Sequence, residues 1–176
     1  MTSSDALTGT DRLAEAARQI EADLYINVQG DEPMLDPQWI VRVIECSKKY
    51  PEAVINCYTL INDNEDPSDP NLPKCVVASD GRLLYMSRAA VPAMKAAQQR
   101  KPDYYKQVCI YAFRKAHLEM FDKRGVKATC EQFEDIEILR FLDIGVPVQM
   151  LQVENSTIAV DVPEDVVRVE QAMTQD

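Results

Sequence analysis

Two aspartates in the sequence each follow a short apolar run. Asp31 lies a few residues beyond the run Leu24–Val28, and Asp161 directly follows Val160. A carboxylate just past a buried strand lies at the carboxyl edge of the sheet, where open α/β folds bind their ligands. Two such carboxylates would form a hard-oxygen pair suited to Mg²⁺ and phosphates. The simpler alternatives are an ordinary strand-to-helix turn at Asp31 and a helix N-cap at Asp161 before Pro163.

Three further groups carry side chains with binding chemistry. The segment Thr8–Arg12 places hydroxyls, a glycine and an arginine at an expected helix start, where an anion or a base can bind. Arg88, at the end of an expected hairpin, could hold a carboxylate through two parallel hydrogen bonds. Glu131 and Glu134 fall on neighbouring helix positions and could hydrogen-bond sugar hydroxyls. The plainer interpretations are a capped helix, a solvated arginine and a solvated acidic face.

Strand-like and helix-like segments alternate along the chain. Short apolar runs predict strands over 24–28, 53–61, 107–113 and 146–153. Apolar spacing and capping residues predict helices over 13–20, 37–49, 115–123, 134–144 and 163–173. Asp80 and Gly81 indicate the turn of a hairpin over 75–86, and an acidic, proline-rich surface loop precedes it. The alternation predicts an α/β domain with a largely parallel sheet.

The composition excludes several classes of partner. The chain of 176 residues has 19 basic and 29 acidic residues, so its formal net charge is −10. This acidity argues against nucleic acid or an anionic membrane as a partner, because both attract clusters of lysine and arginine. No apolar run approaches the roughly 18 residues of a membrane span. The first residues also lack the basic and apolar regions of a secretory signal.

The cysteines and the single histidine bear on compartment and mechanism. Five widely spaced cysteines without a C-x-x-C pair are typical of reduced thiols in a cytoplasmic protein. His117, the only histidine, falls in a helix-like stretch. Catalysis by a Ser-His or Cys-His pair would depend on that one residue, so we expect neither.

Taken together and in order, the motifs resemble the 3-deoxy-manno-octulosonate (Kdo) cytidylyltransferase family. The matching segments are Thr8–Glu15, Asn27–Pro33, Lys74–Val77, Leu84–Arg88, Ile110–Arg114, Glu131–Arg140 and Val160–Asp165. The resemblance implies the nucleotide-diphospho-sugar transferase fold, which is Rossmann-like, with a mixed, mostly parallel sheet and helices on both faces. It also implies transfer of CMP from CTP to the hydroxyl of a sugar acid, with release of pyrophosphate.

The resemblance also implies a role for each matching site residue. Asp31 and Asp161 would be the Mg²⁺ ligands and, with Arg88, the catalytic residues. The residues around the nucleotide would be Thr8, Gly9, Thr10, Arg12 and Gln29. The residues lining the sugar-acid pocket would be Arg88, Gln107, Tyr111, Glu131 and Glu134. Mg²⁺ and Arg88 would then offset the negative charge that CTP and a sugar acid bring to an acidic protein.

Three residues depart from the family pattern near the expected sugar pocket. Gln107 stands where the family usually has histidine, Cys109 where it has glycine, and Ile138 where it has glutamine. We therefore expect CTP-dependent transfer, with the acceptor left open between Kdo, another nonulosonate and a phosphonate.

The beginning of the chain departs further from the family pattern. Met1 falls almost on the Thr8–Arg12 motif, without the preceding strand and triphosphate-binding loop, so we expect residues 1–176 to be a partial cytidylyltransferase domain with impaired activity. A nucleotide-binding or dimerising protein without catalysis is the remaining alternative. The hairpin and the polar arm over about 75–106 would serve a homodimer.

Overall fold

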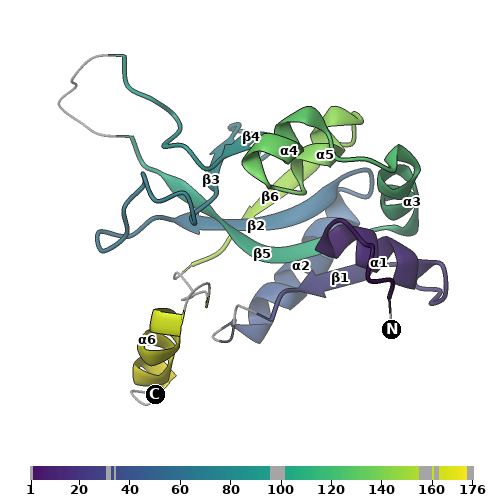
Figure 1. Cartoon of the computed structure of the whole chain (residues 1–176), viewed down its shortest axis with the longest axis horizontal. Helices are drawn as coiled ribbons and strands as arrows, with labels where there is room; N and C mark the ends of the chain where they lie inside the picture. Colours follow the sequence, from purple (N-terminus) through teal and green to yellow (C-terminus); the bar gives the residue numbers. More distant parts are fainter. Residues whose placement is uncertain are drawn as a thin grey trace.

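The computed structural model describes residues 2–30, 33, 35–95, 102–154, 160 and 163–173 of the chain (Figure 1). Its helices are α1 (Gly9–Ala17), α2 (Pro37–Lys49), α3 (Lys115–Arg124), α4 (Thr129–Glu134), α5 (Leu139–Asp143) and α6 (Pro163–Met173). Its strands are β1 (Tyr25–Val28), β2 (Val54–Leu60), β3 (Lys74–Val77), β4 (Leu83–Ser87), β5 (Tyr105–Phe113) and β6 (Val148–Gln152). None of the described helices is long and apolar enough to cross a bilayer.

The strands form one mixed sheet in the order β4-β3-β5-β2-β6, with β1 also paired to β5. The prediction of a mostly parallel sheet is wrong, because β2–β6 is the one parallel pairing among the described strands. β1, β2 and β6 do run in the same direction, as strand–helix alternation requires. However, β5 lies between β1 and β2 and runs against both, so these two strands share a direction without being neighbours.

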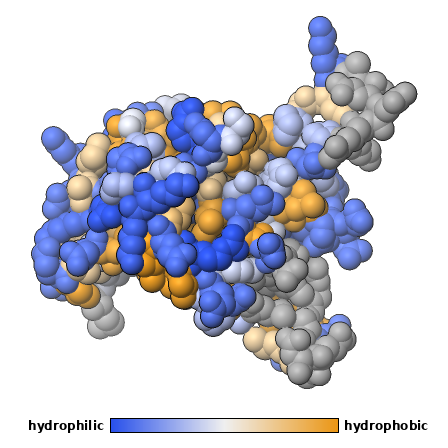
Figure 2. Space-filling view, turned by 180° about the vertical axis from the view of Figure 1, so that it is seen from behind, coloured by the Kyte–Doolittle hydropathy of each residue, from blue (hydrophilic) through white to orange (hydrophobic). Residues whose placement is uncertain are grey.

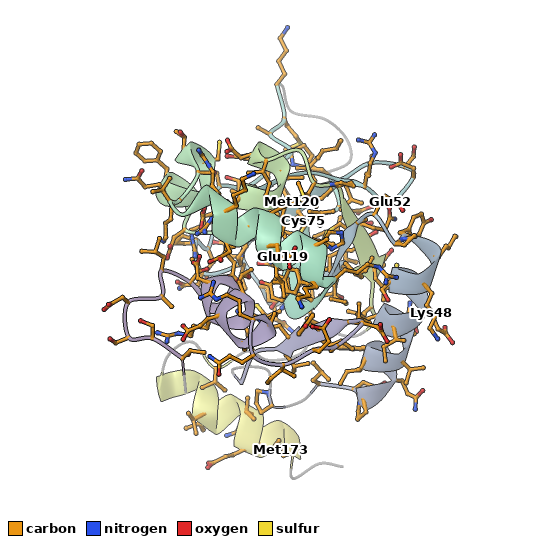
Figure 3. All side chains as sticks on the ribbon, turned by 90° about the vertical axis from the view of Figure 1, so that its right-hand side faces the viewer. Lys48, Glu52, Cys75, Glu119, Met120 and Met173 are labelled. Carbon is orange, nitrogen blue, oxygen red and sulfur yellow. The ribbon has the colours of Figure 1, made fainter. Side chains whose placement is uncertain are left out.

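Helices cover both faces of the sheet, as predicted. On one face Ala14 of α1, Phe121 of α3 and Phe141 of α5 pack with Phe113 of β5. The Phe113 and Phe141 rings stack with centroids 5.5 Å apart, and those of Phe141 and Phe121 lie 4.8 Å apart. On the other face α2 packs its apolar residues, Trp39 among them, against β2 and β5. Figure 3 shows this separation from the side, with Lys48 on α2 and Met120 on α3.

Local sequence signals place several elements as predicted. α2 begins at Pro37 because the Asp36 carboxylate accepts the Gln38 N–H as an N-cap, and it ends at Lys49. The hairpin turns at Gly81, whose φ of +84° is a left-handed conformation that glycine adopts without strain. All five cysteines are free thiols, in agreement with the composition. The surface is largely hydrophilic with smaller apolar patches, as Figure 2 shows for one side.

The helix predicted over 134–144 is wrong in its first half: α4 ends at Glu134, a break follows, and α5 begins only at Leu139. The break begins at Asp135, which has a φ of +50°. Arg88 fixes the break, because its Nε donates to the Glu134 carbonyl and one of its terminal nitrogens donates to the Asp135 carbonyl. Those carbonyls are therefore held by a distant arginine rather than by a continuous helix.

Candidate functional site

The beginning of α1 brings together most of the residues predicted to lie around the nucleotide. Thr8 is the N-cap of α1, and its Oγ1 accepts the Asp11 N–H at 3.3 Å. Thr10 is buried, and its backbone N–H donates to Glu137 Oε2 at 2.9 Å. A Cβ on Gly9 would lie 3.7 Å from both Gln29 Nε2 and Glu137 Oε2. The start of α1, the residue after β1 and the segment between α4 and α5 therefore meet at one place.

Arg12 differs from the other residues of this group. Its side chain is exposed, and its guanidinium donates to the Ser3 carbonyl at 2.7 Å and to Thr2 Oγ1 at 3.4 Å. In this arrangement the Arg12 side chain holds the segment before α1.

A buried ionic network fastens α1 to α4 and α5. The Arg140 guanidinium donates to Asp11 at 2.9 Å and to Glu131 at 2.7 Å, and the side chains of Arg140 and Glu131 are fully buried. The same guanidinium lies 3.8 Å from the centroid of the Phe121 ring. Burial acts to lower the pKa of Arg140, but the hydrogen bonds that it donates to Glu131 and Asp11 outweigh burial and raise that pKa. Arg140 is therefore a permanent cation.

Glu131 thus lies in a different place from the one that the sequence suggested. Besides Arg140, its carboxylate accepts the Ala128 N–H at 2.9 Å. With no exposed side-chain surface, Glu131 holds the fold of the site rather than lining a pocket for a sugar. The sequence signal for this was Arg140, nine residues on, whose pairing depends on the break between α4 and α5.

Glu134 and Arg88 form a second cluster at the end of the hairpin. The Glu134 carboxylate accepts hydrogen bonds from the Ser87 hydroxyl at 2.8 Å, the Arg88 backbone N–H at 2.8 Å and the Tyr85 hydroxyl at 3.3 Å. Partial burial acts to raise the pKa of Glu134, but these hydrogen bonds outweigh it, and the pKa lies below its ordinary value. Burial is the main cause that raises the pKa of Tyr85, to about 12. Both groups keep their usual charge at neutral pH.

The Arg88 guanidinium binds backbone rather than a free carboxylate. It donates to the carbonyls of Pro70, Glu134 and Asp135 at 2.7, 2.5 and 3.0 Å. A guanidinium has five N–H donors, so these bonds leave two for another partner. Arg88 therefore orders the loop before β3 and the end of α4, and it keeps donors for a ligand.

A polar group on the sheet joins the two remaining residues predicted for the sugar-acid pocket. The Gln107 side-chain amide donates to Asn56 Oδ1 at 2.9 Å and to the Tyr111 hydroxyl at 3.1 Å. Asn56 is fully buried and donates to the carbonyls of Val108 and Ile110, where the pairing of β2 with β5 is irregular. Sequence reasoning missed Asn56, although an asparagine within an apolar strand run is an available signal.

The two predicted Mg²⁺ ligands, Asp31 and Asp161, lie outside the described residues. The chain before Asp31 is described as far as Gly30, beyond the end of β1. Within the described part of the chain, no group of three or more His, Cys, Asp or Glu side chains could hold a metal ion.

The fold is that of known nucleotidyltransferases, and the comparisons with known sequences and structures agree on this class. The family model for cytidylyltransferases matches residues 1–157. A 3-deoxy-manno-octulosonate cytidylyltransferase from Acidobacterium capsulatum is 36% identical over 99% of this chain and 70% of its own length. A mitochondrial one from Arabidopsis thaliana is 32% identical over 99% of this chain and 61% of its own.

A solved structure agrees with these relatives. The CMP:2-keto-3-deoxy-manno-octonic acid synthetase complexed with CTP is 33% identical, with a TM-score of 0.88 over 99% of this chain and 71% of that one. The chain belongs to the 3-deoxy-manno-octulosonate cytidylyltransferase family, and it spans about 61–71% of the length of these three relatives.

Proposed function

We propose that this chain carries the nucleotide and sugar-acid sites of an enzyme that transfers CMP from CTP to Kdo or a related 2-keto sugar acid. The observation that carries the proposal is the meeting of Thr8, Gly9, Thr10 and Gln29 beside Glu137. The similarity to a synthetase complexed with CTP supports it.

The reaction is a displacement at the α-phosphorus of CTP. The sugar-acid hydroxyl oxygen forms a bond to that phosphorus, the bond to the bridging oxygen breaks, and pyrophosphate leaves while the hydroxyl proton is released. Catalysis of this kind rests mainly on positioning and on stabilising charge. Arg88 has two N–H donors left for the sugar carboxylate, and Gln107 and Tyr111 present polar groups on the neighbouring strand.

Mg²⁺ is the proposed cofactor, with Asp31 and Asp161 as its ligands. Carboxylate oxygens are the donors that Mg²⁺ prefers, and when bound the ion would neutralise phosphate charge. Gln29 lies directly after β1 and two residues before Asp31, so its contact with the Gly9 group brings that end of β1 to the proposed nucleotide. Chelation by EDTA should abolish turnover and added Mg²⁺ should restore it, whereas Asp31→Asn should not respond to Mg²⁺.

The test of the function is pyrophosphate release with Mg²⁺, CTP and a panel of sugar acids that includes Kdo and other nonulosonates. We expect release that depends on both CTP and one acidic acceptor, with one CMP-sugar formed per pyrophosphate. Tight CTP binding without release for any acceptor would instead favour a protein that binds nucleotide without catalysis. A wide preference for Kdo would show that Gln107, Cys109 and Ile138 leave the acceptor unchanged.

A homodimer through the hairpin is part of the proposal. β4 is the last strand on its side of the sheet, and Leu84 on it is half exposed. An edge strand with an exposed apolar side chain is a surface suited to pairing with a second copy. Sedimentation should show a dimer that Leu84→Lys weakens, and a monomer at every concentration for the unsubstituted protein would contradict it.

A further inference from the structure

A fully buried asparagine, Asn56, supports the irregular pairing between the neighbouring strands β2 and β5 (Figure 1). The register of this pairing shifts between Asn56 and Cys57. At the shift the Asn56 amide nitrogen donates to the carbonyls of Val108 at 3.1 Å and Ile110 at 2.9 Å. The side chain of Asn56 therefore satisfies backbone carbonyls of β5 at a place where regular strand pairing is interrupted.

These two carbonyls determine which way round the Asn56 amide lies. A carbonyl oxygen only accepts hydrogen bonds, so the end of the amide that faces both carbonyls must be its NH₂ group. Asn56 Oδ1 therefore lies at the other end, where it is 2.9 Å from the Gln107 amide. Because Oδ1 also only accepts, the Gln107 atom that faces it must be Nε2. The backbone of β5 thus fixes the orientation of the Gln107 amide through Asn56.

The Gln107 amide nitrogen has two hydrogens, and both have acceptors in the protein. One acceptor is Asn56 Oδ1, and the other is the Tyr111 hydroxyl oxygen at 3.1 Å. The carbonyl oxygen of the Gln107 side chain, Oε1, accepts no hydrogen bond within the described part of the chain. Gln107 is also partly exposed. It therefore offers a ligand an acceptor oxygen, while its donors are already used.

Gln107 and Arg88 border the same loop before β3. The Gln107 backbone N–H donates to the Pro73 carbonyl at 2.9 Å, and Arg88 donates to the Pro70 carbonyl at 2.7 Å. Their chemistry is complementary, because an arginine with free donors binds a carboxylate, whereas an amide oxygen binds a hydroxyl and repels a carboxylate.

We propose that Asn56 is a positioning residue for the acceptor substrate. It holds the Gln107 amide so that Oε1 accepts a hydrogen bond from a hydroxyl of the sugar acid, and the carboxylate of the sugar acid is left to Arg88. The acceptor that fits is a polyhydroxylated acid, since a phosphonate without hydroxyls lacks the donor for Gln107. This inference rests on the proposed function, because it requires that a sugar acid binds beside β5.

The first experiment titrates Kdo into protein that carries ¹³C and ¹⁵N in its glutamine side chains. We expect the side-chain carbonyl carbon of Gln107 to shift progressively to saturation. Its NH₂ resonances should change less, because both hydrogens keep their acceptors. If Kdo binds and the NH₂ resonances shift without the carbonyl carbon, or neither shifts, the proposal is overturned. If neither Kdo nor any other acid of the panel binds, the proposed function itself fails.

The second experiment compares Asn56→Leu with Asn56→Asp, two side chains of similar shape. Both variants lose the NH₂ group that holds the β5 carbonyls, so both should have a lower melting temperature. Only the aspartate keeps an acceptor where Oδ1 lies, so only Asn56→Asp should keep Gln107 in its orientation. We expect Asn56→Leu to weaken Kdo binding about 3- to 10-fold, with Mg²⁺–CTP binding unchanged, and Asn56→Asp to bind Kdo as the unsubstituted protein does.

The comparison separates positioning from a purely structural role. Equal weakening of Kdo binding in the two variants would assign Asn56 to strand pairing alone and overturn the proposal, as would unchanged Kdo binding in Asn56→Leu. If either variant fails to fold, the Gln107 resonances of the unsubstituted protein still decide between the outcomes.

Discussion

Two glutamates on the same stretch of chain are linked to α1, Glu137 directly and Glu131 through Arg140, yet their surroundings are opposite. Glu131 is buried, and both of its carboxylate oxygens accept hydrogen bonds, from Arg140 and from the Ala128 N–H. Glu137 holds α1 with one oxygen and leaves the other without a partner among the described residues. The difference distinguishes two kinds of carboxylate. In a structural carboxylate both oxygens have hydrogen-bond partners in the protein, whereas a ligand-binding carboxylate keeps an oxygen that can still accept a hydrogen bond.

Removing Arg140 should have the largest effect, because the buried Glu131 carboxylate and the partly buried Asp11 carboxylate both lose their cation. We expect Arg140→Ala to lower the free energy of unfolding by about 3–5 kcal/mol, as measured by urea denaturation. The control is Arg124→Ala, which breaks a pair with Asp143 whose side chains are 40% and 42% exposed and should cost less than about 1 kcal/mol. Equal losses in the two variants would show that the network is not a distinct structural unit.

Neutralising Glu131 should have a smaller effect on stability, since Arg140 keeps Asp11 as a partner. Glu131→Gln should cost about 1–3 kcal/mol in the same measurement, because a charge-assisted hydrogen bond is lost in a buried place. Glu137→Gln should cost less than Glu131→Gln, because the amide oxygen can still accept the Thr10 N–H. A larger loss of stability for Glu137→Gln than for Glu131→Gln would contradict the distinction between the two glutamates.

Arg88 tests the same distinction in the second cluster. Lysine lacks the planar fork that reaches three carbonyls, so Arg88→Lys should lower the free energy of unfolding by about 1–2 kcal/mol. It should also raise KM for the sugar acid, because the two remaining donors are lost. An unchanged stability with a raised KM would show that Arg88 serves only the ligand.

The smallest expected effect is the pH dependence contributed by Glu134. Its pKa in the folded protein lies below the ordinary value of 4.5, chiefly because burial is outweighed by hydrogen bonds from Arg88, Ser87 and Tyr85. A carboxyl group with a depressed pKa stabilises the fold fully above its ordinary pKa, and that contribution declines as the pH falls through the folded value. Urea midpoints should therefore decline less on acidification for Glu134→Gln than for the unsubstituted protein. Parallel curves for the two proteins would contradict this.

The elements that could be predicted from the sequence are those whose ends depend on capping and turn residues. Asp36 before Pro37 caps α2, and Gly81 forms the turn of the hairpin, and both signals depend only on neighbouring residues. The direction of neighbouring strands could not be read this way, because the place of β5 between β1 and β2 depends on pairings distant in sequence. The break at Asp135 depends on Arg88, 47 residues earlier, so the spacing of apolar residues could not predict it.

The candidate site was predictable to a similar degree. Thr8, Gly9, Thr10 and Gln29 meet because the start of α1 and the end of β1 are adjacent, and their place around a nucleotide stays a prediction. The burial of Glu131 was not predictable, since its spacing from Glu134 suits an exposed face and a buried pair equally. The sequence also could not show that one carboxylate oxygen of Glu137 has no partner among the described residues.

The most direct test of the central claim follows backbone amide resonances in ¹H–¹⁵N spectra while Mg²⁺–CTP is added. The account predicts that the Thr10 amide, which donates to Glu137, shifts progressively to saturation. The Ala128 amide, which donates to the saturated Glu131, should move little. Equal shifts at both amides, or a shift at Ala128 with none at Thr10, would contradict the assignment of one glutamate to the ligand and the other to the fold.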